Sequence, residues 1–428
     1  MIAAVFVVFF VAILLCVPVG VVLLISAMVP YTLTGNFAVN PEYLIRNLAQ
    51  AFNNISLIAI PLFILSGVLM ARGQISKKIY DFFSYFIGKL PGGMPSAVVV
   101  TCLFYGAISG SGPATTAAVG SMTIPMLISL QYEPAFAAAL VAVAGGLGVI
   151  IPPSIPFIMY SDSSGASIGN MFTAGILPGI LIGILLIGYT IFYCVKHGED
   201  KEKIYALVDS LRAKGFLYIF KESFFALLSP IIILGGIYSG WVTPTEAACI
   251  SVVYALIVSM FVYKTVSLKE LPAILVESIR TLSPCIVITG AAAIFAKAIT
   301  LLRVPQAVVS LLGGIVDNKI ALLLLLNLVL LVTGCLIDTG AAVLIMTPIL
   351  LPVVKLIDMN IVHFGIMMVV NLAIGFVTPP VGMNLFVAAS LTQLKVMRIA
   401  KKAVPLLLMF FIALMLITFI PAISLLLI

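Results

Sequence analysis

Residues 109–116 read Ser-Gly-Ser-Gly-Pro-Ala-Thr-Thr, and residues 145–154 read Gly-Gly-Leu-Gly-Val-Ile-Ile-Pro-Pro-Ser. Both runs lie within long apolar segments, where an uninterrupted helix is the usual structure. Glycine and proline interrupt helices, and the serine and threonine hydroxyls add polar oxygens. Related interruptions return at 334–340 and 375–380. The chain is therefore expected to break its helices in two separate parts of the sequence.

The amino-acid composition excludes an ordinary soluble protein. Hydrophobic residues make up 63% of the 428 residues and charged residues 9%. Soluble domains are about half apolar and about one quarter charged. The apolar segments are about twenty residues long and lack strict alternation, which indicates spanning helices rather than a β-barrel. We predict an all-α polytopic membrane protein.

The net charge of +7 has a membrane explanation. The 22 lysines and arginines fall mainly in short segments between apolar runs. Such residues set the orientation of a membrane protein and contact anionic lipid headgroups, so nucleic acid is not an expected partner. Their distribution predicts a cytoplasmic N-terminus and a periplasmic C-terminus.

The first half, residues 1–195, is predicted to contain a scaffold span, an arm helix, a hairpin and a broken helix. In the arm segment, apolar residues share the helix with Lys77, Lys78 and Asp81, which is typical of an interfacial helix. A straight helix interrupted by Ser-Gly-Ser-Gly-Pro would lose hydrogen bonds in lipid, so a re-entrant hairpin is expected. The predicted bounds are 2–29 for the first span, 74–90 for the arm helix, 95–130 for the hairpin and 135–160 for the broken helix.

The second half, residues 223–428, is predicted to repeat this plan after a charged cytoplasmic connector at 196–222. The predicted bounds are 266–283 for the arm helix, 284–302 for a separate span, 320–356 for the hairpin, 361–391 for the broken helix and 404–428 for the last span. Gly-x-x-x-Pro-Pro occurs in both broken helices, at 148–153 and 375–380. The two halves would enter the membrane from opposite sides, which defines an inverted-topology repeat.

Broken helices can bind ions and substrates near the bilayer centre. Their new N-termini suit an anion, and their free carbonyls suit Na⁺. The expected ligands of a first Na⁺ are Ser109, Ser111, Gly145, Gly148 and Ile151. Those of a second Na⁺ are Gly334, Asp338, Thr339, Gly340, Gly375, Thr378 and Val381. The expected substrate contacts are Ser109, Thr115, Ser154, Asp338 and Asn384.

The interrupted segments, and the chain as a whole, also have other interpretations. Small residues also let helices pack closely, and proline also kinks them. Asp338 would lie in an outer loop if the second hairpin were misplaced. His-Glu-x-x-His is absent from the sequence, and no acid pair or Ser-His arrangement supports an intramembrane enzyme. A channel is disfavoured because inverted hairpins around a polar site are typical of alternating access.

The interrupted segments together resemble a known family. The runs Gly-Ser-Gly-Pro-Ala-Thr-Thr-Ala at 110–117, Gly-Gly-x-Gly-x-x-Ile-Pro-Pro-Ser at 145–154 and Gly-Phe-Val-Thr-Pro-Pro-Val-Gly at 375–382 carry the likeness. They resemble the large membrane subunit, M or DctM-like, of tripartite ATP-independent periplasmic (TRAP) transporters. The resemblance covers nearly the whole chain.

This resemblance implies an elevator-type, Na⁺-coupled importer in a bacterial inner membrane. It also implies two partners, a small four-helix Q membrane subunit and a periplasmic substrate-binding P subunit. A separate Q chain is expected because the large-subunit pattern begins at the first span. The implied substrates are carboxylates, namely C4-dicarboxylates, sialic acid, other sugar acids and keto acids.

Asp338 favours one substrate class over another. Its carboxylate would repel a dicarboxylate but accept hydroxyl hydrogen bonds from a sugar acid such as sialic acid. This preference disappears if Asp338 binds Na⁺ instead. The alternatives are a C4-dicarboxylate TRAP importer and a stand-alone Na⁺/dicarboxylate two-hairpin transporter.

Overall fold

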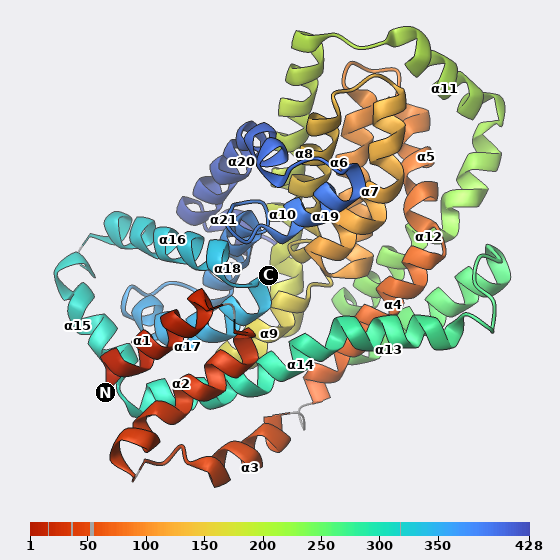
Figure 1. Cartoon of the computed structure of the whole chain (residues 1–428). Coiled ribbons are helices and arrows are strands. Elements are labelled where there is room, and N and C mark those ends of the chain that lie inside the picture. The colour runs from red at the N-terminus through yellow and green to blue at the C-terminus, as the bar shows by residue number, and fades with distance from the viewer. Residues whose placement is uncertain (16, 36, 52–54, 317) are drawn as a thin grey trace.

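A computed structural model describes residues 1–15, 17–35, 37–51, 55–316 and 318–428. In these ranges the regular elements are helices, without strands (Figure 1). Among the described residues, seven helices are long and apolar enough to cross a membrane, or eight if the bent pair α4 and α5 counts as one span. The prediction of an all-α polytopic membrane protein is confirmed.

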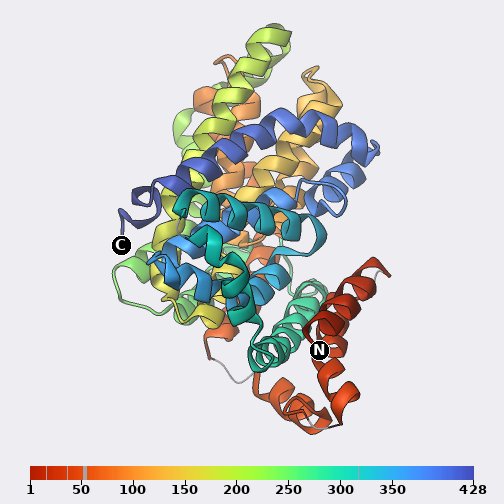
Figure 2. The ribbon, with the colours of Figure 1, turned by 90° about the vertical axis from the view of Figure 1, so that its left-hand side faces the viewer.

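The N-terminal region forms two helices where one span, 2–29, was predicted. The helices α1 (Ile2–Leu14) and α2 (Val19–Thr34) pack on each other. The prediction is wrong because Pro18 precedes α2, and a proline disfavours helical backbone in the residue before it. The next helix, α3 (Pro41–Ala51), and α2 both pack along α14, as Figures 1 and 2 show.

The predicted arm helix at 74–90 coincides with a bend in the chain. Here α4 (Ala59–Arg72) and α5 (Ile75–Ile87) meet at 65°. Gln74 lies between them with a φ of 53°, a left-handed backbone that ends α4 and redirects the chain. One face of α5 is buried against α6 and α12. Whether α5 acts as an arm stays a prediction.

The second predicted arm helix, 266–283, is not a separate element. One helix, α14 (Leu271–Leu301), runs unbroken for 31 residues and includes the span expected at 284–302. Pro284 lies inside it. The prediction is wrong because a proline within a membrane helix is tolerated when neighbouring groups satisfy the freed carbonyl.

Two sets of elements follow the same order, each with a hairpin, a broken helix and a long helix. Both Pro-Pro bonds, at 152–153 and 379–380, are cis. The first set is α6 (Gly93–Ser109), α7 (Gly112–Ser129), α8 (Pro134–Gly145), α9 (Ile155–Ser164) and α10 (Ile168–His197). The second is α16 (Lys319–Leu336), α17 (Thr339–Leu356), α18 (Ile361–Gly375), α19 (Met383–Thr392) and α20 (Val396–Phe419). That the sets are inverted repeats within 1–195 and 223–428 stays a prediction.

The remaining helices connect these sets and end the chain. Residues 196–222 are largely helical, so the predicted connector is an ordered segment. The last span is α20, which begins at Val396 rather than at the predicted residue 404. Its first turns therefore include Lys401 and Lys402. The connecting and terminal helices are α11 (Lys201–Ala213), α12 (Phe216–Tyr238), α13 (Pro244–Ile257), α15 (Val304–Val316) and α21 (Ala422–Leu425).

The two sets interlock around a shared core. The first halves of both broken helices, α8 and α18, are buried along almost their whole length. The alanine-rich α8 packs against α7 of its own set and against α19 and α20 of the other. Small side chains permit this close approach between helices. Likewise, α17 packs against α9, and α7 packs against α19, so each hairpin is held by the broken helix of the other set as well.

Candidate functional site

The tip of the first hairpin concentrates polar oxygens. The left-handed Gly110, with a φ of 62°, ends α6 just after Ser109. The hydroxyls of Ser109 and Thr115 lie 2.7 Å apart, and Thr115 donates to the carbonyl of Ser111 at 2.8 Å. Three oxygens of neutral groups thus lie close together at the junction of α6 and α7, without a cationic side chain in these bonds.

The first helix break lies directly against this tip. After α8, residues Gly146–Val149 form a 3₁₀ turn, and Ser154 caps α9 by accepting from Phe157 N at 3.4 Å. A Cβ added to Gly148 would lie 2.4 Å from Thr115 Oγ1 and 2.7 Å from the Ser111 carbonyl oxygen. A glycine is therefore required for the break to approach the hydroxyl cluster.

The second hairpin and the second break make an equivalent contact. A Cβ added to Gly375, at the end of α18, would lie 2.2 Å from the carbonyl oxygen of Gly334 in α16. Past the break, Val381 N donates to the Cys335 carbonyl at 3.4 Å. Asp338 caps α17 by accepting from Gly340 N at 3.0 Å. Its carboxylate therefore serves a helix N-terminus in this conformation.

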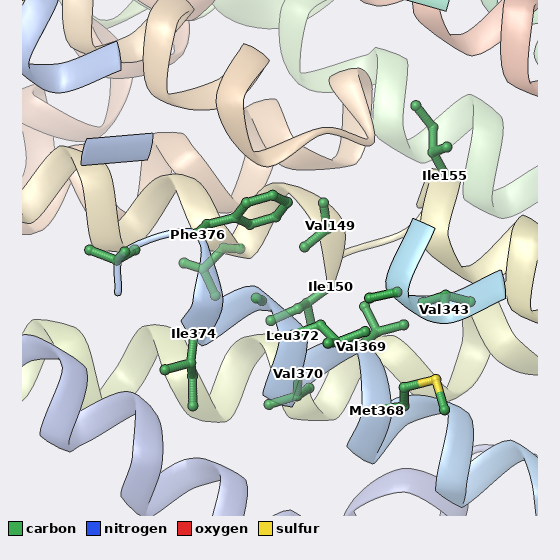
Figure 3. Packing of buried hydrophobic residues seen from close by; sticks show 14 of the residues in the cluster. Val149, Ile150, Ile155, Val343, Met368, Val369, Val370, Leu372, Ile374 and Phe376 are labelled. Carbon is green, nitrogen blue, oxygen red and sulfur yellow. The ribbon is translucent and has the colours of Figure 1, made fainter. Parts of the chain in front are cut away.

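The two breaks also meet each other through apolar packing. Figure 3 shows Val149 and Ile150 of the first break beside Phe376 of the second break and Leu372 at the end of α18. A polar contact joins the halves as well, because Asn384 Nδ2 donates to the Ala142 carbonyl at 2.9 Å. Asn384 Oδ1 is buried and accepts no hydrogen bond from the described residues. A carbonyl oxygen of this kind is suited to bind a cation or a water molecule.

The first hairpin tip forms part of the wall of a cavity of about 720 Å³. Ser109 and Ser111 line it from the hairpin, while α4 and α14 form the opposite side. Three charged side chains line the cavity, namely Arg72, Lys77 and Glu277. With two cations and one carboxylate, the cavity wall favours an anionic ligand.

The structure brings together most of each predicted ion set. Ser109, Ser111 and Gly148 meet at the first tip. Gly145, at the end of α8, lies against Thr116 of the same hairpin. Ile151 directs its side chain toward Gly179 of α10. In the second set Gly334, Gly375 and Val381 surround one contact, and Thr378 Oγ1 bonds to the Ile374 carbonyl at 2.8 Å. Asp338, Thr339 and Gly340 instead begin α17, beside Met159 of α9.

The five predicted substrate contacts do not share one cavity in this conformation. Ser109 lines the 720 Å³ cavity. Thr115, Ser154 and Asn384 are fully buried, each held by a hydrogen bond within the protein. Asp338 is outside the lining of that cavity. Their joint role in substrate binding therefore stays a prediction.

Comparison with protein families identifies the chain. Residues 6–423 match the family described as "Tripartite ATP-independent periplasmic transporter, DctM component". The chain belongs to this family. The resemblance seen in the interrupted segments is therefore confirmed, and the protein is a multi-pass membrane protein of a bacterial transporter family.

Relatives within the TRAP family carry different substrate names. The isethionate TRAP transporter permease protein DctMQ of Oleidesulfovibrio alaskensis is 40% identical over 95% of this chain, which spans 63% of that protein's length. The C4-dicarboxylate large permease DctM of Pseudomonas aeruginosa is 36% identical, with 89% of each chain covered. The sialic acid large permease SiaM of Vibrio cholerae is 33% identical, with 96% of this chain and 94% of that one covered.

Two solved structures share the fold at low sequence identity. The YdaH transporter of Alcanivorax borkumensis has a TM-score of 0.63 at 15% identity, covering 95% of this chain and 97% of that one. MtrF of Neisseria gonorrhoeae has a TM-score of 0.59 at 14% identity, covering 88% and 83%. These similarities support the membrane-transporter fold of this TRAP permease.

The sequence-based interpretation missed the charged residues of the cavity in this TRAP permease. Arg72 and Lys77 were interpreted as markers of membrane orientation, and Glu277 as part of a second arm helix. Arg72 and Glu277 are 205 positions apart in the sequence, so no local pattern links them. The available signal was the position of Arg72, at the end of an apolar helix directly before a Gly-Gln turn.

Proposed function

We propose that this permease imports a small organic acid by Na⁺-coupled secondary transport. The single observation that carries the proposal is the contact between Gly148 and the Ser111–Thr115 oxygens at the edge of the 720 Å³ cavity. It places neutral oxygens, suited to Na⁺, beside a space whose charged residues suit an anion. The protein acts as a transporter and not as an enzyme, in keeping with its relatives.

The first Na⁺ is assigned to Ser109, Ser111 and the carbonyls of Gly145, Gly148 and Ile151. The second is assigned to the Gly334–Gly375 contact with Thr378 and Val381, with Asp338, Thr339 and Gly340 at the adjoining helix N-terminus. Asn384 Oδ1 adds a buried carbonyl oxygen between the two breaks. Ligands from hairpins and breaks together would couple ion binding to the position of these elements.

The substrate we favour is a hydroxylated acid with one negative charge, such as sialic acid or another sugar acid. Asp338 supports this choice if it faces the substrate, because its carboxylate accepts from hydroxyls and repels a second acid group. Isethionate, in the name of one relative, is also a hydroxylated monoanion. The alternative is a C4-dicarboxylate, as named for another relative.

Two partners and an elevator movement complete the proposal. A periplasmic binding protein would deliver the acid, and a small membrane subunit would join the permease. The tripartite family description and the relative named DctMQ support these partners. The hairpins and breaks would move as one body, because they interlock across the two sets.

The test is uptake of labelled sialic acid, isethionate and succinate into proteoliposomes that hold the permease with its Q and P proteins. We expect uptake of one acid to require an inward Na⁺ gradient and all three proteins. Ser109→Ala and Thr378→Ala should each weaken the Na⁺ dependence. Equal uptake with K⁺ in place of Na⁺ would overturn the coupling, and full uptake by the permease alone would establish the stand-alone alternative.

A further inference from the structure

The cavity contains an ion pair between two elements that face the first hairpin tip. Arg72 is the last residue of α4, and Glu277 lies in α14. Arg72 Nη2 lies 2.6 Å and Nε 3.2 Å from Glu277 Oε2. Both side chains line the same cavity as Ser109 and Ser111.

This pair leaves the guanidinium only partly matched. Both hydrogen bonds end on one oxygen of Glu277. The planar fork of arginine is best satisfied by two oxygens that accept two parallel N–H groups. A carboxylate or sulfonate that approaches from the cavity can offer such a pair of oxygens.

The pair is also inexpensive to break. The side chains of Arg72 and Glu277 are 58% and 45% exposed. Ion pairs with this much exposure stabilise a protein only weakly because water screens them. A ligand that contacts Arg72 therefore meets little competition from Glu277.

The surroundings favour an anion at this place. Lys77 lines the cavity from α5, just past the 65° bend that follows Arg72. Gln74, in the bend, adds an uncharged polar side chain to the same wall. A cationic ligand in the cavity would be repelled by Arg72 and Lys77, whereas an acid would be attracted by both.

We propose that Arg72 exchanges partners during transport. It separates from Glu277 and binds the acid group of the substrate in the cavity beside the first hairpin tip. While the cavity holds no substrate, the carboxylate of Glu277 pairs with Arg72 and holds its side chain in place. This proposal rests on the proposed import of an organic acid. It makes Arg72 a residue that determines selectivity for anions.

The test measures binding of a labelled acid to the purified full-length permease with its membrane partner, by scintillation proximity. The acid is the one that the wild-type complex transports in the panel described above. Arg72→Gln should weaken binding about tenfold or more, since it removes charge-assisted hydrogen bonds. Glu277→Gln should tighten binding only slightly, because the carboxylate that it removes competes weakly for Arg72. Arg280→Gln, three residues further along α14 and outside the cavity lining, is the matched control and should bind as the wild type does.

A charge exchange separates substrate binding from a structural role. Arg72→Glu combined with Glu277→Arg keeps an ion pair between α4 and α14. If Arg72 binds substrate, the double variant regains the melting temperature of the wild type without regaining acid binding. Acid binding at wild-type strength by the double variant, or by Arg72→Gln, overturns the proposal. Failure of the wild-type complex to transport any acid would instead overturn the proposed function.

Discussion

Lys402 Nζ lies 2.6 Å from Glu133 Oε2, which joins α20 of the second set to the turn before α8 of the first. The Tyr193 hydroxyl donates to the same carboxylate oxygen at 3.0 Å. Three elements that are far apart in the sequence therefore meet on one acidic side chain. The last span was predicted to begin at residue 404, after Lys402, but Lys402 lies within α20, where it reaches this partner.

Replacing Glu133 by Gln should lower the melting temperature slightly at neutral pH. The pair is partly exposed, so its contribution is below about 1 kcal/mol. Partial burial raises the pKa of the Glu133 carboxyl, but Lys402 and Tyr193 lower it more, so its pKa lies below the ordinary value. Such a group stabilises the protein above the ordinary pKa and loses that effect as the pH falls through the lowered one.

Thermal unfolding in detergent between about pH 3 and pH 7 checks this prediction, across the range in which carboxyl groups titrate. The difference between wild type and Glu133→Gln should shrink toward acid pH. Glu42→Gln, on the exposed first turn of α3, serves as the control and should differ little from wild type throughout. An unchanged difference at acid pH would contradict the assigned role of the carboxylate.

Replacing Gly148 by Ala should abolish most Na⁺-dependent uptake. The added Cβ would lie 2.7 Å from the Ser111 carbonyl oxygen, a backbone atom that cannot rotate away. The break and the hairpin tip must then separate, and displacements of about 1 Å at a functional site can reduce rates on the order of tenfold or more. Gly188→Ala is a matched control, because nothing lies within 4 Å of its added Cβ. Normal uptake by Gly148→Ala would remove this contact from the ion site.

Replacing Gly375 by Ala should destabilise the protein as well as impair transport. Its Cβ would lie 2.2 Å from the Gly334 carbonyl oxygen, so α16 and α18 must move apart. Overpacking of this kind typically costs about 1–3 kcal/mol. The measurement is the melting temperature beside that of Gly235→Ala, whose Cβ meets no atom within 4 Å. Equal melting temperatures for the two variants would show that the contact adapts.

Replacing Asn371 by Ala should destabilise the junction of three helices. The Asn371 amide donates to Asn327 Oδ1 at 2.8 Å and to the Asn327 carbonyl at 2.9 Å, while Asn327 donates to Thr418 Oγ1 at 3.2 Å. Loss of such buried bonds between membrane helices costs about 1 kcal/mol. A double-mutant cycle with Asn327→Ala should show coupling; strictly additive effects would exclude a shared network.

The broken elements were predictable because their signals are local. Glycine and proline act within a few residues of their own position, so the pairs at 148–153 and 375–380 marked both breaks. The tips of the hairpins followed from glycine and proline in the run at 109–116 and from glycine in the run at 334–340. Gly148 and Gly375 each bring a break into close contact with a hairpin, whereas the role of hairpin and break as one binding site stays a prediction.

The missed features depend on contacts between distant segments. A boundary was predicted between the arm helix ending at 283 and the span beginning at 284, yet α14 continues through Pro284, because tertiary packing decides whether a proline ends a helix. The pairing of Arg72 with Glu277 and of Lys402 with Glu133 could not be deduced from local patterns. The first span was also misjudged, since a break near Pro18 separates α1 from α2.

The uninterrupted α14 ties this permease to the thickness of its host bilayer. A helix of 31 residues is about 46 Å long, whereas the hydrocarbon core of a bilayer is about 30 Å thick. The helix must tilt strongly or extend into the headgroup region, where its early residues Glu277 and Arg280 are best solvated. We therefore expect lipids with longer or shorter acyl chains to change the depth of Glu277 relative to Arg72.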